Sequence, residues 1–103
     1  MPRETMDFYS DYFNRIWVEW VDSGMVRVPF IHQELRTEWC LSTYKTGLLR
    51  ILKVRRKLNL MGFPIVYVKI DIDEKMKKFE ETFGFTEYHR TDESIFMYQK
   101  TEV

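Results

Sequence analysis

The sequence predicts a mixed α+β domain in which helices and strands follow the order α-β-β-α-β-α-β-β. Three observations support this fold class. Residues 65–72 form a β-branched apolar run, which is typical of a strand covered on both faces. Residues 44–62 are basic and have the amphipathic spacing of a helix. Residues 85–90 and 95–100 alternate in character around a polar turn, which predicts an antiparallel hairpin.

Length and composition predict one globular domain over residues 1–103. The chain has 45% hydrophobic and 17% aromatic residues, enough for a single core. We divide it into an N-terminal aromatic helix, residues 1–24, and a sheet with helices, residues 25–103. An apolar run of about 18 residues and a signal-peptide pattern are both missing, so we expect no membrane contact. The single Cys40 cannot form an intramolecular disulfide, and we expect no metal site.

The first segment, residues 7–21, has apolar side chains at the three-to-four spacing of a helix. Trp17 and Trp20 would lie on the same side of that helix. Two interpretations stay open. The helix packs on the sheet as part of the core, or its tryptophans form a partner interface, because tryptophan is favoured at interface hot spots.

Residues 25–31 and 35–41 are interpreted as the next two strands. Pro29 places the first of them at a sheet edge or a bulge, because proline cannot donate to a central ladder. Cys40 falls in the second strand and is interpreted as a small buried hydrophobic residue.

The basic segment is predicted to be a helix that starts between Tyr44 and Gly47 and ends at Gly62. Residues 44–62 hold six basic residues and no acidic one. Five of the basic residues share the polar face: Lys45, Arg50, Lys53, Arg56 and Lys57. This face is either solvated or a docking surface for an anionic partner such as an acidic protein, a nucleic acid or a cofactor's phosphates.

The apolar strand of residues 65–72 leads into a short helix with clear end signals. Asp71 and Glu74 have the spacing of a capping box, and Asp73 is a rival N-cap. Phe79 and Phe83 follow at helical spacing and are predicted to be buried. Gly84 supplies the left-handed residue that ends the helix.

The passage Phe79-Glu80-Glu81-Thr82-Phe83-Gly84-Phe85 resembles the last helix of the GNAT family of N-acetyltransferases. The resemblance covers residues 35–100. It implies a divergent, shortened GNAT-like fold, with helices on both faces of a mixed sheet. The chain is also similar to small GNAT-like proteins of bacteriophages, some of which are internal virion proteins.

The resemblance also implies which residues would carry acetyl-coenzyme A chemistry. In that family a glycine-rich loop before the helix cradles the cofactor's pyrophosphate; here Tyr44, Lys45 and Gly47 would contact it, and only Gly47 matches. Glu80 stands where the family often has a tyrosine general acid. A glutamate is ionised at neutral pH, so Glu80 would instead be a base, with Tyr67 as a substitute proton donor.

Two functions follow from these features. The first is a GNAT-like domain without catalysis or cofactor, which binds a phage or host protein or forms part of a virion, in the host cytoplasm or the particle. Its candidate interaction residues are Trp17, Trp20 and the basic residues Arg50, Lys53, Arg56 and Lys57. The alternative is an acetyl-CoA-dependent N-acetyltransferase with an atypical cofactor loop. Nucleic-acid binding is not favoured, because the formal net charge is zero.

Overall fold

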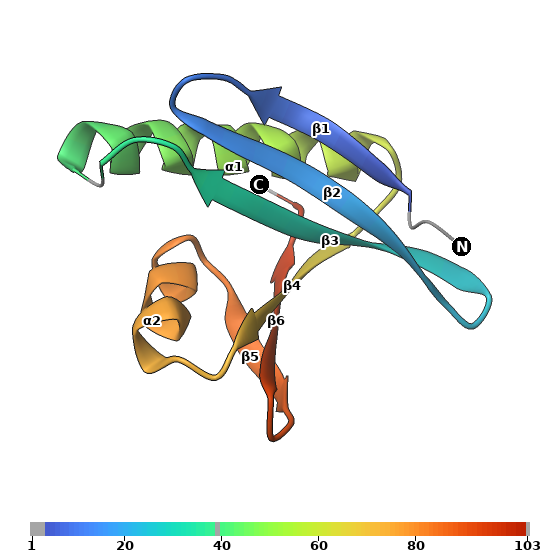
Figure 1. Cartoon of the computed structure of the whole chain (residues 1–103). Coiled ribbons are helices and arrows are strands. Elements are labelled where there is room, and N and C mark those ends of the chain that lie inside the picture. Colours follow the sequence, from blue (N-terminus) through green and yellow to red (C-terminus); the bar gives the residue numbers. More distant parts are fainter. Residues whose placement is uncertain (1–3, 39, 103) are drawn as a thin grey trace.

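A computed structural model describes residues 4–38 and 40–102 of the chain (Figure 1). Within them, six strands form one mixed sheet and two helices pack on it, which confirms the α+β class. The elements are β1 Thr5–Ser10, β2 Asn14–Ser23, β3 Val26–Leu35, α1 Leu41–Leu60, β4 Ile65–Asp71, α2 Glu74–Thr82, β5 Thr86–Arg90 and β6 Ser94–Lys100. The strands lie in the order β1-β2-β3-β4-β6-β5. Only β3 and β4 run parallel; the other neighbouring strands are antiparallel.

The predicted N-terminal helix is wrong: residues 7–21 belong to the hairpin of β1 and β2. The buried side chains of β2 alternate with less buried ones, beginning at Asn14, Ile16 and Val18. Ile16 and Trp20, four residues apart, share one face in a helix and in a strand alike, and the β-branched and aromatic character of the segment favours the strand. Asp11 makes the turn by accepting hydrogen bonds from the backbone N–H groups of Phe13 and Asn14.

The strand predicted over residues 25–31 is part of β3, but the separate second strand predicted over residues 35–41 is wrong. One ten-residue strand, β3, pairs along its whole length with β2 and is followed by α1. The sheet-edge position that Pro29 suggested for this strand is wrong too, since β3 lies between β2 and β4. However, β3 joins β4 through a single register pair, Phe30 with Tyr67, so the ladder on the β4 side does not extend to Pro29. Trp39, in the predicted second strand, lies outside the described residues.

Both predicted helices of the C-terminal part are present, with shifted starts. Helix α1 begins at Leu41, before the expected start, and its N-cap is Cys40. Helix α2 uses Asp73 as its N-cap: the carboxylate accepts hydrogen bonds from the N–H groups of Lys75 and Met76. The prediction that Asp71 and Glu74 form a capping box is therefore wrong. Gly84 has a φ of 96°, which confirms the predicted left-handed stop.

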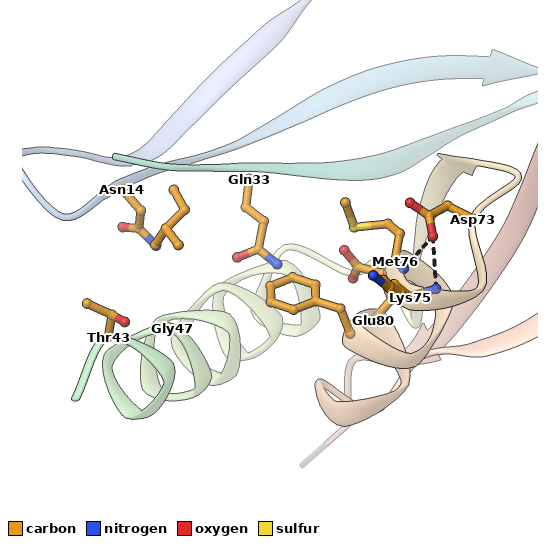
Figure 2. A pocket seen from close by; sticks show the side chains of 10 residues that line it. Asn14, Gln33, Thr43, Gly47, Asp73, Lys75, Met76 and Glu80 are labelled. Carbon is orange, nitrogen blue, oxygen red and sulfur yellow. Dashed lines mark hydrogen bonds between the residues drawn. The ribbon is translucent and has the colours of Figure 1, made fainter. Parts of the chain in front are cut away.

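Helices on both faces of the sheet were expected, and this expectation is wrong. The core joins inward side chains of β2, β3, β4 and β6 to both helices; its members include Val18, Ile31, Val66 and Met97 from the sheet, Ile51, Val54 and Leu58 from α1, and Phe83 at the end of α2. Figure 2 shows α1 and α2 beneath the same side of β3. The apolar run of β4 is buried on this side only, at Val66 and Val68, while Lys69 is exposed. The other side of the sheet, which we call the open face, is covered by no described element.

Across the described part of the chain, no helix is both long and apolar enough to cross a membrane.

Candidate functional site

A cavity of about 400 Å³ lies where β2 and β3 face the two helices. Its walls include Asn14 of β2, Gln33 of β3, Gly47 of α1, and Phe79 and Glu80 of α2 (Figure 2). A concave site of this size, mostly apolar with a few converging polar groups, is the usual form of a small-ligand site. The cavity is therefore one candidate site of this domain.

Glu80 is the titratable group buried in the wall of this cavity. It is only 5% exposed. Burial raises its pKa to about 7, against a hydrogen bond with Gln33 that lowers it. Figure 2 shows Gln33 reaching down from β3 toward α2. Within the described residues no lysine or arginine forms an ion pair with Glu80, so this carboxyl can take up or release a proton near neutral pH.

Tyr67, the other candidate catalytic residue, is not brought near Glu80. It lies on β4 with its side chain on the open face, where its ring stacks on Phe30 at 5.4 Å between centroids. The sheet thus separates the two groups, and a shared proton relay between them has no geometric basis.

The three candidate cofactor contacts lie within α1 and not in a loop before it. Tyr44, Lys45 and Gly47 follow the start of the helix at Leu41, so their backbone N–H groups lie in the helical ladder. Gly47 is buried, and a Cβ there would lie 3.5 Å from the Phe83 ring. Gly47 therefore lies within α1 and contacts Phe83, and it is not part of a loop before the helix.

The true start of α1 is capped by Cys40 and Thr43. The Thr43 hydroxyl accepts a hydrogen bond from the N–H of Cys40 at 2.8 Å, and the two residues form a capping box. Cys40 is exposed, so its interpretation as a buried hydrophobic residue is wrong. Hydrogen bonds from Ser42 and Thr43 lower the pKa of its thiol to about 7.

The basic face of α1 is divided in its role. Arg50 has a side chain only 16% exposed and forms a 2.6 Å ion pair with Asp11 in the β1–β2 turn. This pairing raises the pKa of Arg50 and holds that of Asp11 well below its usual range. Arg50 is therefore an internal link between α1 and the hairpin. By contrast, Lys53 and Arg56 are exposed.

Lys57, the last candidate of the basic face, lies at the C-terminal end of α1. It is exposed, and its ammonium group is 5.8 Å from the centre of the Phe8 ring of β1. Such a distance allows a weak cation–π contact. The candidate basic residues therefore do not act as one unit.

The two candidate tryptophans of β2 point to opposite sides of the sheet. Trp20 is on the helix side and packs against Phe63, with 4.9 Å between ring centroids. Trp17 is on the open face, where it stacks on His32 of β3 at 5.2 Å. Trp17 and Trp20 therefore do not form a single interface patch, because odd-numbered and even-numbered positions of a strand face opposite sides of the sheet.

The open face carries rings from five strands, in one stacked pair on β2 and β3 and a second group that extends from β3 to β5. Its members are Trp17, Phe30, His32, Tyr67, Tyr88, Phe96 and Tyr98. Tyr88 is 49% exposed and contacts Tyr67 and Tyr98, with centroids 5.8 and 5.9 Å apart. We call this set the aromatic row. Sequence reasoning missed it, although the alternation of Phe96 and Tyr98 with Ile95 and Met97 already placed two of its rings on one face.

No protein-family model matches this chain, and the comparison with curated proteins finds no match.

Proposed function

We propose that this chain is a non-catalytic interaction domain, GNAT-like in its resemblance, whose docking surface is the open face. The observation that carries the proposal is the aromatic row on a sheet side that no described element covers. Tyr88 is exposed and the other rings of the row are half-buried. Apolar surface of this kind marks interaction sites, and tyrosine and tryptophan are the residues that contribute most to binding there. Through the phage resemblance, the setting we propose is a virion or the host cytoplasm.

The packing of the rings favours a protein partner over single-stranded nucleic acid. Bases bind by stacking on free ring faces of aromatic side chains. Here the guanidinium of Arg15 lies 4.2 Å from the centre of the Trp17 ring, and His32 stacks on the same ring. Phe30 and Tyr67 likewise stack on each other. Rings occupied in this way present a joined apolar surface, which suits a protein.

The location of the docking surface can be tested by exchanging single exposed residues. Tyr88→Arg places a charge in the aromatic row, and Lys53→Glu changes the outer side of α1. Co-purification with a binding partner from the producing cells should be lost with Tyr88→Arg and kept with Lys53→Glu, at unchanged melting temperature. Loss with Lys53→Glu alone would move the docking surface to the basic helix.

The second candidate function is an acetyl-CoA-dependent N-acetyltransferase, and Glu80 is the observation that favours it. A carboxylate buried beside a cavity, with a pKa near 7, is suited to accept a proton from an ammonium group. The predicted cofactor loop gives no support, because Tyr44, Lys45 and Gly47 lie within α1 and form no loop before it.

A thermal shift with acetyl-CoA separates the two functions. A ligand present at a hundredfold its dissociation constant stabilises the folded state by about 2.7 kcal/mol. We expect no saturable shift for the interaction domain. A saturable shift, together with acetyl transfer that Glu80→Gln abolishes, would establish the enzyme instead.

A further inference from the structure

The open face is divided into two halves of opposite charge. The β1–β3 half carries the carboxylates of Asp7, Glu19 and Glu34 and two guanidiniums, those of Arg15 and Arg36, which pair with Asp7 and Glu34. The β4–β6 half carries the ammonium groups of Lys69 and Lys100, with one carboxylate, Asp71, at the end of β4. The aromatic row runs across both halves. The first half is therefore net negative and the second net positive.

The boundary between the halves is also the middle of the sheet. Three strands, β1, β2 and β3, lie on one side of the parallel join, and β4, β6 and β5 lie on the other. Figure 1 shows the two groups of strands strongly twisted relative to each other. A twisted sheet has a saddle-shaped surface. A saddle turned over about an axis along its middle strands is complementary to the original saddle.

We propose that the open face binds a second copy of this chain, with a twofold axis along the join of β3 and β4. This inference rests on the proposed function and names its partner. The rotation lays the negative half of each copy on the positive half of the other and brings the aromatic rows together. The result is an isologous dimer with two packed sheets, whose inner faces lie about 10 Å apart.

The charge of the whole chain permits this pairing. The formal net charge is zero, so two copies do not repel each other at long range. Lys69 and Lys100 form no ion pair among the described residues, whereas the arginines of the sheet, such as Arg15 with Asp7, are paired within the chain. The two lysines are thus available to the acidic half of a partner.

The test measures molar mass by light scattering across a range of protein concentrations. The parent chain should reach twice the monomer mass. Lys69→Glu combined with Lys100→Glu makes both halves negative, and Asp7→Lys combined with Glu34→Lys makes both halves positive. Each double variant should dimerise roughly tenfold or more weakly than the parent, because like charges then meet across the interface.

Mixing the two double variants is the decisive step. The negative variant and the positive variant attract each other in both halves, so an equimolar mixture should recover the dimer mass. Lys53→Glu, on the outer side of α1, is the matched control and should dimerise like the parent. A cooperative thermal unfolding transition shows that each variant is folded.

Three outcomes would overturn the inference. The parent stays monomeric at every concentration, the double variants dimerise normally, or the mixture does not recover. If the parent is monomeric but Tyr88→Arg still abolishes co-purification, the proposed function stands and the partner is a different protein. If the parent instead binds a single-stranded oligonucleotide through Tyr88, both the dimer and the protein partner are wrong.

Discussion

Glu80 makes the stability of this domain depend on pH. Its pKa rises from the ordinary 4.5 to about 7 in the folded chain, so the folded state binds this proton more tightly than the unfolded state. The contribution of Glu80 to the free energy of unfolding is therefore fully present below pH 4.5, and it is lost as the pH rises to 7. A shift of this size corresponds to about 3 kcal/mol between the two limits.

The matched variant is Glu80→Gln, which keeps the shape and cannot ionise. Urea denaturation at pH 4.5 and at pH 8 gives the free energy of unfolding of both proteins. The free energy of unfolding of the variant, measured relative to that of the parent, should rise by about 3 kcal/mol from the acidic to the alkaline condition. A pH-independent difference between them would show that the carboxyl is solvated and that α2 packs less closely on β3.

Cys40 should react as a partly ionised thiol at neutral pH. The hydrogen bonds from Ser42 and Thr43 lower its pKa to about 7, and the thiolate is the nucleophile in alkylation. The rate of iodoacetamide modification, followed by mass spectrometry, should reach half its plateau near pH 7. Ser42→Ala removes the largest cause and should move that midpoint upward. An unchanged midpoint in Ser42→Ala would contradict this arrangement of the cap.

At the scale of elements, the contact between α1 and α2 depends on Phe83. Its side chain is 4% exposed and lies against Gly47, Phe79 and Tyr44. Phe83→Ala should cost about 3–5 kcal/mol of unfolding free energy, because a cavity replaces a buried ring. Denaturant titration measures this directly. A melting temperature within a few degrees of the parent would mean that the two helices do not pack as described.

Gly47→Ala changes the residue of α1 that lies opposite Phe83 in the same contact between the helices. A Cβ at this position would meet the Phe83 ring at 3.5 Å, which is ordinary van der Waals contact. Alanine is also favoured over glycine within a helix by about 1 kcal/mol. We therefore expect this variant to match or exceed the parent in stability, in contrast to Phe83→Ala.

The β1–β2 turn is attached to α1 through Arg50. Its guanidinium donates to the carboxylate of Asp11 and to the side-chain oxygen of Asn14, and it lies 4.7 Å from the centre of the Tyr9 ring. Arg50→Ala should lower the melting temperature by a few degrees, whereas Lys53→Ala on the exposed side should not change it. Equal melting temperatures for the two variants would mean that the link contributes nothing.

For the whole molecule, the C-terminal half was predictable from the sequence and the N-terminal half was not. The apolar run of β4, the helix ended by Gly84 and the final hairpin each have one dominant local signal, so periodicity and end residues identify them. In β2, by contrast, Ile16 and Trp20 lie four residues apart, a spacing that places them on one face in a helix and in a strand alike. The choice depends on pairing with β3, which is distant in sequence and invisible to local patterns.

The candidate site was predicted only in part for the same reason. Glu80 could be singled out by its position in the helix, but its pKa depends on burial beneath Gln33, a residue of another element. The aromatic row likewise depends on the order of the strands, because Trp17, Tyr67 and Tyr88 come to lie on one face only when five strands are aligned. Sequence analysis found single members of this surface and assigned Trp20, which faces the core, to the same patch.

The join of β3 and β4 at the single pair Phe30 and Tyr67 has a consequence for the order of folding. The hairpins on either side close over short loops, whereas this join closes over the whole of α1 and therefore forms at a higher entropic cost. We expect the β1–β3 meander and the β4–β6 unit to behave as two cooperative blocks. In native-state hydrogen exchange, the amides flanking the join should exchange through smaller openings than those at the centre of either block.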